Sequence, residues 1–119
     1  MQLAESDQKA DLFKLSPEEI LLKWFNFHLK NAGASEITNL GRDLADSVAL
    51  TYLLNQLDQE KCSLDALNKR NDLERANAMI NNSKALGVAD VVGPADIIRG
   101  NVKVNLVFIS EIFNTKYVN

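Results

Sequence analysis

The chain has 119 residues, of which 46% are hydrophobic and 24% charged, and its formal net charge is −3. This length and composition are typical of one globular domain that buries a core without disulfides or metals. No run of 18 apolar residues occurs, and the polar first residues lack the apolar stretch of a secretory signal, so we expect neither a membrane span nor secretion. One cysteine, Cys62, suits a reducing compartment, and the acidic, mixed charge pattern argues against a broad nucleic-acid-binding surface.

Residues 1–13 are polar and charged, and we interpret them as a linker or N-terminal arm before a domain of residues 14–117. The domain opens with strong signals for a helix start. Ser16 is placed to cap the helix, Pro17 suits its first position, and Glu19 is spaced to complete a capping box. The predicted core face of this helix then recurs at helical spacing until Gly33, through Leu21, Trp24, Phe25, His28, Leu29 and Ala32.

The middle of the chain predicts two more helices and a helical turn, joined by ordered loops. After a loop over residues 34–45, Asp46 or Ser47 can cap a helix that carries leucines at positions 50, 53, 54 and 57. A polar, irregular stretch follows. A cap at position 71 or 72 then begins the next helix, whose apolar face runs from Leu73 until Gly87 ends it. A short helical turn is expected at residues 93–98.

The last long stretch, residues 101–114, is the element around which we expect the other helices to pack. Eight of the twelve residues from Val102 to Phe113 are apolar, and a helix that is apolar nearly all round is a buried one. The alternation of its first β-branched residues would also suit a strand, but Val107 and Ile109 break that alternation. The sequence therefore predicts an all-α fold of four main helices, with short helices and long ordered loops around a buried C-terminal helix.

The residues offer little support for catalysis or for a cofactor. His28 lies on the apolar side of the first helix, where a packed histidine is expected rather than a general base. One histidine and one cysteine cannot form a structural zinc site, and neither a calcium-binding loop nor a phosphate-binding glycine loop is present. The paired carboxylates Glu18–Glu19 and Asp43–Asp46 are explained more simply by capping and helix-dipole roles. We therefore expect a protein without enzymatic activity, metal or cofactor.

A binding role has one candidate on physical grounds. Leu22, between Lys23 and Asn26, is predicted on the exposed side of a well-capped helix and could form part of a contact patch. The simpler interpretation is a solvated helix face with one stray leucine, which needs no functional explanation. These residues alone favour the simpler interpretation.

Several segments, in order and spacing, resemble the calponin-homology domain family. The run Leu21-Leu22-Lys23-Trp24-Phe25-Asn26 matches the tryptophan-bearing first helix of that family. The matches continue through Ile37-Thr38-Asn39-Leu40, through Asp43-Leu44-Ala45-Asp46-Ser47-Val48-Ala49-Leu50 with Leu53-Leu54, and through residues 96–106 with Ile112-Phe113-Asn114. The resemblance covers residues 14–117 and is strongest to the second domain of the tandem actin-binding region in fimbrin (plastin) bundling proteins.

Two positions depart from the family's pattern. Ser47 stands where many members have glycine, and Val102 stands where fimbrins often have proline. The first departure changes the start of one helix, and the second removes a pre-set first turn of another. We expect neither to alter the fold.

The resemblance implies a cytoplasmic, actin-cytoskeletal module that binds actin filaments and an adjacent calponin-homology domain of the same chain, without a cofactor. It implies that the second domain is weak on its own, with a contact surface made of Phe13, Lys14, Glu18, Leu22, Lys23 and Asn26. The alternative is a regulatory or scaffolding domain that binds a neighbouring domain or a signalling protein. A microtubule-binding relative usually has a strongly basic surface, and the net charge of −3 argues against that use.

Overall fold

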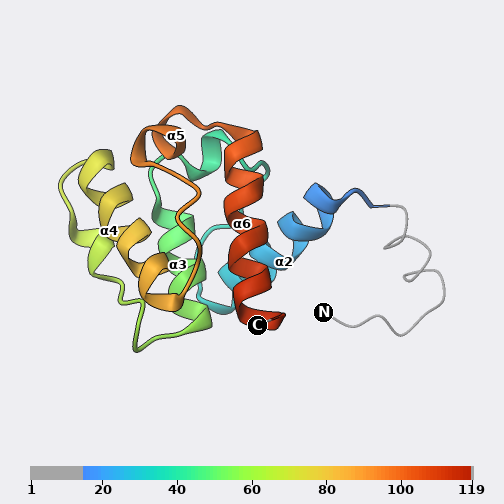
Figure 1. The fold of residues 1–119 in the computed structure, drawn as a ribbon, viewed down its shortest axis with the longest axis horizontal. Coiled ribbons are helices and arrows are strands. Elements are labelled where there is room, and N and C mark those ends of the chain that lie inside the picture. Colours follow the sequence, from blue (N-terminus) through green and yellow to red (C-terminus); the bar gives the residue numbers. More distant parts are fainter. Residues whose placement is uncertain (1–14, 119) are drawn as a thin grey trace.

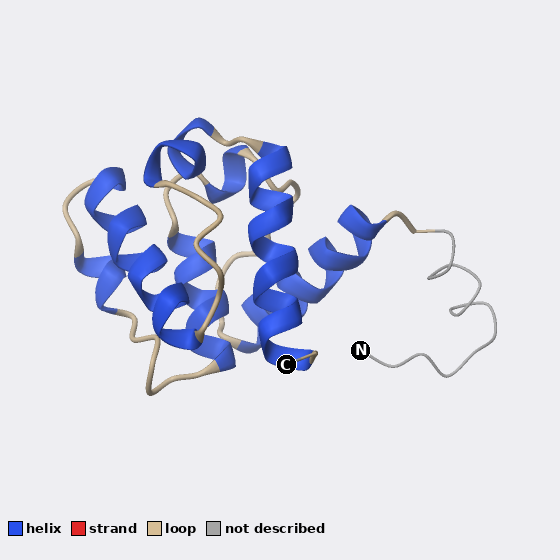
Figure 2. Ribbon diagram, viewed as in Figure 1, coloured by secondary structure: helices blue, strands red, loops and turns tan. Residues whose placement is uncertain are grey.

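The computed structural model describes residues 15–118, and every regular element in that range is a helix (Figure 1 and Figure 2). The predicted all-α architecture of four main helices with shorter ones between them is confirmed. None of the helices within residues 15–118 is long and apolar enough to cross a membrane. In chain order the elements are α2 (Pro17–Asn31), η1 (Arg42–Leu44), α3 (Val48–Leu57), η2 (Asp65–Asn68), α4 (Asp72–Leu86), α5 (Pro94–Arg99) and α6 (Val102–Tyr117).

The ends of the long helices are set by local sequence, as predicted. Ser16, Asn71 and Asn101 begin α2, α4 and α6, and each side-chain oxygen accepts a hydrogen bond from the backbone N–H three residues later, at 3.2, 2.9 and 3.3 Å. These bonds satisfy N–H groups that have no partner inside the helix. At the other end of α4, Gly87 has a φ of 102°, a left-handed conformation that glycine adopts without a steric cost.

Helix α3 is the most deeply buried helix, since six of its ten residues are buried. Of the two predicted caps, Asp46 is the one whose side chain acts, because its Oδ1 accepts the Val48 N–H at 3.0 Å. Ser47 instead has a φ of 64°, and it is the one residue other than glycine within residues 15–118 that has a positive φ. Glycine adopts this conformation without a steric cost, so the position suits the glycine that the resemblance implies for other members of the family.

The core lies between α2, α3 and α6, with α4 and α5 closing it. Phe25 and Leu29 from α2 and Phe108 and Ile112 from α6 are almost completely buried together with the leucines of α3. Figure 1 shows α6 crossing α2 in the body of the fold. The helical spacing of these apolar residues therefore identified the three helices that make the core.

In α4 and α6, some apolar positions expected inside the fold are exposed instead. Helix α6 is not buried all round, because Val107 is 50% exposed while Asn105, Phe108, Ile109 and Ile112 face the core. Leu73, expected on the apolar face of α4, is 54% exposed in the first turn of that helix. Single exposed aliphatic side chains cost little, so the apolar count of a helix overestimates its burial.

Buried contacts tie the loop before η1 to the start of α6. The Asn105 Nδ2 donates a hydrogen bond of 2.8 Å to the carbonyl oxygen of Leu40 inside the core. Nearby, the backbones of Gly41 and Gly100 approach so closely that a Cβ on Gly41 would lie 2.8 Å from the Gly100 oxygen. These contacts fix the loop that follows α2, and thereby the surroundings of the outer face of α2.

Candidate functional site

The first turn of α2 stands away from the body of the domain. Residues 16–20 are all exposed, including Ile20 at 38%, and Figure 1 shows this end of α2 extending beyond the other helices. Glu18 and Glu19 lie in this turn, where negative charge is favoured by the N-terminal end of the helix dipole. Glu18 is thus exposed, as the contact surface implied by the resemblance requires. Phe13 and Lys14 lie outside the described residues.

Leu22 does not stand free on the solvent side of α2. It is partly buried and packs against the core cluster, so the expectation of an exposed, stray leucine is wrong. Leu21, Phe25 and Leu29 are the buried residues of α2, and the side of the helix that faces the core is broader than their spacing indicates. Leu22 therefore contributes to the packing of α2 and offers only part of its side chain to a partner.

Asn26 has a structural partner already. Its Nδ2 donates to the Ile37 carbonyl oxygen and its Oδ1 accepts from the Ile37 N–H, both at 2.8 Å. The amide thus pairs with both backbone groups of one loop residue, as a neighbouring strand would. This pair of bonds holds the loop that follows α2 against the helix, so Asn26 positions the edge of the face on which Lys23 lies.

The solvent face of α2 places two further residues, Phe27 and Lys30, beside the predicted contact residue Lys23. Lys23, Phe27 and Lys30 are exposed and recur at intervals of four and three residues, which places them on one side of the helix. They line a hollow of about 490 Å³ together with Asn26, Asn31 and Glu36. Phe27 is 43% exposed, which is unusual for so large an aromatic side chain. The signal in the sequence is the spacing of four residues between Lys23 and Phe27, which places both on one side of the helix. The apolar spacing of the core face does not reveal it.

His28 confirms the interpretation of a packed histidine. Its ring lies edge-on to Trp24 at 5.2 Å and to Phe27 at 5.4 Å between ring centroids. Both ring nitrogens are shielded from solvent, and neither has a hydrogen-bond partner within the described residues. Burial lowers the pKa of His28 below its ordinary value; the nearby Gln56 amide opposes this shift, and the charge of Lys116 adds to it. A neutral, enclosed imidazole of this kind fits a packing role.

Cys62 has a structural role as well, and the acidic side chains do not form a metal site within the described residues. The Cys62 thiol is buried, donates to the Asn82 carbonyl oxygen at 3.3 Å, and has its pKa raised by burial to about 11, so it is not a reactive thiolate. Among residues 15–118, no group of three or more histidine, cysteine, aspartate or glutamate side chains is arranged to hold a metal ion.

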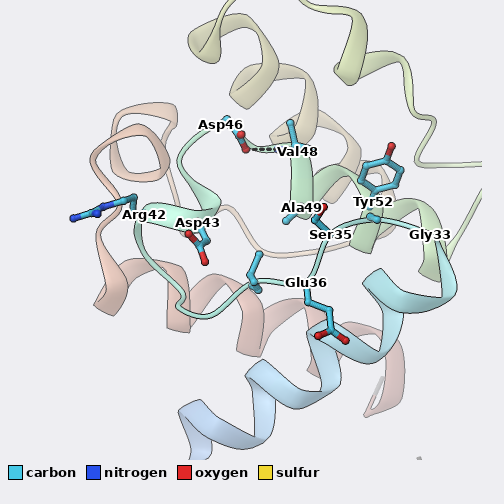
Figure 3. A pocket seen from close by; sticks show the side chains of 11 residues that line it. Gly33, Ser35, Glu36, Arg42, Asp43, Asp46, Val48, Ala49 and Tyr52 are labelled. Carbon is cyan, nitrogen blue, oxygen red and sulfur yellow. Dashed lines mark hydrogen bonds between the residues drawn. The ribbon is translucent and has the colours of Figure 1, made fainter.

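A second hollow, of about 560 Å³, lies between the loop after α2 and the start of α3 (Figure 3). Its acidic side chains include Asp43 and Asp46, which the sequence analysis assigned to structural roles. Asp43 accepts hydrogen bonds from the Thr38 N–H and hydroxyl at 2.8 and 3.0 Å, and these donors lower the pKa of Asp43. Asp46 caps α3. Since each carboxylate has local partners, the pair is not arranged for acid–base catalysis.

The family model described as the calponin homology (CH) domain matches residues 15–117, and the chain belongs to this family. It is a domain of the fimbrin and plastin type. It is 42% identical to human (Homo sapiens) plastin-1 over 121 residues, which cover 95% of this chain and 19% of that protein. It is 40% identical to zebrafish (Danio rerio) plastin-3, and this match covers 94% of this chain and 19% of that protein.

A solved structure agrees with these relatives. The structure described as the actin-crosslinking core of Schizosaccharomyces pombe fimbrin matches with a TM-score of 0.87 and 36% identity, over 96% of this chain and 24% of that one. The chain thus spans about a fifth of the length of the curated relatives that it matches, namely 19%. The predicted resemblance to a calponin-homology domain of the fimbrin and plastin type is confirmed.

Proposed function

We propose that this domain is an actin-filament-binding module of a longer, fimbrin-like filament-bundling protein, without enzymatic activity and located at the cytoplasmic actin cytoskeleton. The observation that carries the proposal is the 36% identity, at a TM-score of 0.87, to a structure whose title names an actin-crosslinking core. The exposed, rigid outer face of α2 supports it. We further propose that the domain is the second of a tandem, contacts an adjacent calponin-homology domain, and binds weakly on its own.

The contact surface that we propose is the linker end and the first helix, with Phe13, Lys14, Glu18, Leu22, Lys23 and Asn26. Lys23 is its clearest contributor within residues 15–118, because its side chain is exposed and no ion pair there occupies its charge. The surface of actin is acidic overall, so an exposed lysine attracts it and the attraction weakens with salt. Leu22 and Asn26 have smaller free surfaces, since packing and the bonds to Ile37 engage them.

Cosedimentation with actin filaments tests this proposal. Lys23→Glu should reduce the bound fraction and change its dependence on salt, while helical content and melting temperature stay at the parent values. Lys69→Glu is the matched control, because Lys69 is exposed in the loop between η2 and α4. If the parent chain does not cosediment at low salt, even when joined to an upstream calponin-homology domain, the scaffolding alternative gains support.

A further inference from the structure

We propose that the filament contact is centred on Phe27, with Lys23 and Lys30 on either side, and that it takes an apolar side chain of the filament flanked by carboxylates. The inference rests on the proposed function and deepens it. It adds Phe27 and Lys30, which the resemblance does not imply, and it moves the centre of the contact from the projecting first turn of α2 to its last two turns.

The spacing of the three side chains defines the shape of the proposed contact. Residues four and seven positions apart lie on one face of a helix, so Lys23 and Lys30 flank Phe27 along α2. With a rise of about 1.5 Å per residue, the two lysines are separated by roughly 10 Å along the helix axis. That separation leaves room for one apolar side chain over the ring, with a carboxylate at each end.

The ring of Phe27 is held in place before any partner arrives. The rings of Phe27 and His28 lie edge to face, with 5.4 Å between their centroids, and His28 is itself packed against Trp24. The hollow beside it, of about 490 Å³, is bordered by the loop that Asn26 ties to α2. An aromatic side chain that is fixed and half-exposed loses little conformational freedom on binding, which is why aromatic residues are enriched among the residues that dominate interfaces.

The charges around the ring favour an acidic partner over an apolar one. Neither Lys23 nor Lys30 forms an ion pair within residues 15–118, where the two pairs observed join Arg75 to Asp72 and Lys84 to Asp90. Glu36 is the one carboxylate among the residues that line the hollow. Since the chain as a whole carries a net charge of −3, this local excess of positive charge stands out. A purely apolar partner would leave both ammonium groups without compensation, whereas carboxylates complement them.

The test is cosedimentation of the 119-residue chain with actin filaments at low salt and at rising salt. Phe27→Ala should weaken binding by about tenfold, the loss expected for an aromatic residue at the centre of a contact. Phe27→Leu, which keeps an apolar side chain, should restore part of the affinity. Lys30→Glu should weaken binding as well. As the salt concentration rises, the affinity of the parent chain should fall more steeply than that of Lys23→Glu or Lys30→Glu.

Leu73→Ala and Lys103→Glu are matched controls, because both side chains are exposed on other helices, α4 and α6. Circular dichroism and melting temperature must agree between variants, since Phe27 touches His28. If Lys23→Glu weakens binding while Phe27→Ala and Lys30→Glu leave it unchanged, the proposed function stands and the inference about Phe27 is wrong. If the parent chain binds neither alone nor when joined to an upstream calponin-homology domain, the proposed function fails as well. A Leu73→Ala loss equal to that of Phe27→Ala would also overturn the inference.

Discussion

At the scale of single residues, some polar side chains stabilise the fold in ways that the proposed filament contact does not explain. Asn26 is the clearest example, because the sequence places it beside Lys23 while the structure engages its amide with Ile37. A residue can belong to a contact surface in relatives and still owe its identity to the fold. The two roles are separated by measuring stability and binding on the same variant.

We predict that Asn26→Ala lowers the free energy of unfolding by about 1–3 kcal/mol, because it leaves the Ile37 N–H and carbonyl oxygen without their partners. Urea unfolding measures the change. The control is Asn31→Ala, an exposed amide on the same helix, whose cost should stay within about 0.5 kcal/mol. Equal effects of the two substitutions would mean that the bonds to Ile37 contribute nothing measurable to stability.

Ser47 provides a second prediction, in the stabilising direction. Its φ of 64° is costly for any residue with a Cβ, by roughly 1–2 kcal/mol, and its buried hydroxyl oxygen has no hydrogen-bond partner among the described residues. Glycine removes the strain, but it adds about 0.4–1 kcal/mol of unfolded-state entropy cost. Ser47→Gly should therefore raise stability by about 1 kcal/mol.

The comparison with Ser47→Ala isolates the cause of that gain. Alanine removes the hydroxyl and keeps the strained backbone, so its melting temperature should lie below that of the glycine variant. A glycine variant that is less stable than the parent would show that the serine side chain contributes packing that outweighs the strain.

At the scale of elements, the docking of α2 against α6 depends on a cluster of rings around Trp24. Trp24 meets Phe113 edge-on at 5.1 Å, and its Nε1–H donates to the Tyr117 hydroxyl at 3.2 Å. His28 lies against the same tryptophan. Because burial disfavours the charged imidazole more than the Gln56 amide favours it, protonation of His28 opposes the docking of α2.

The pH dependence of stability follows from that environment. The folded pKa of His28 is lowered from an ordinary value of 6.5, so below that pH the unfolded chain binds the proton more readily. Stability should therefore fall as the pH drops from 7.5 through 6.5 and level off below the folded pKa. His28→Phe, which keeps a ring but cannot titrate, should show a smaller fall in melting temperature over this window.

The Asp43 carboxylate does not contribute to the change in stability over this pH window. The pKa of Asp43 is lowered from 3.8 by the donors of Thr38, so it loses its charge only in more acidic solution. If the parent and His28→Phe lose stability equally between pH 7.5 and 5.5, His28 does not control the docking of α2.

The parts of the fold that sequence reasoning recovered are those decided within a few residues. The caps at Ser16 and Asn101 and the stop at Gly87 follow from side-chain chemistry next to the helix end. The long-range bond from Asn105 to Leu40 has no local signature, because its partners are 65 residues apart. The exposure of Val107 could not be predicted either, since it depends on where α2 and α5 leave α6 uncovered.

At the scale of the whole molecule, one small helix face limits what the isolated domain can do. A contact centred on α2 buries little area, and contacts below about 1,200 Å² are typical of weak, transient complexes. The relatives are about five times longer, since this chain covers 19% of plastin-1. In a longer protein the same face would act at the effective concentration set by its neighbour.

We therefore predict that the 119-residue chain binds actin filaments weakly, and that joining it to an upstream calponin-homology domain raises the affinity well above that of either domain alone. Linkage converts the second contact into an intramolecular one, and gains of about 10²–10⁴ are possible when the geometry allows both contacts. Cosedimentation of the two single domains and the tandem measures the gain.

A tandem that carries Lys23→Glu and Phe27→Ala together is the control, because it keeps the linkage and the fold while removing the α2 contact. Its affinity should fall to that of the upstream domain alone. If the doubly substituted tandem binds as tightly as the parent tandem, the α2 face does not meet the filament. The domain would then act on its neighbour rather than on actin.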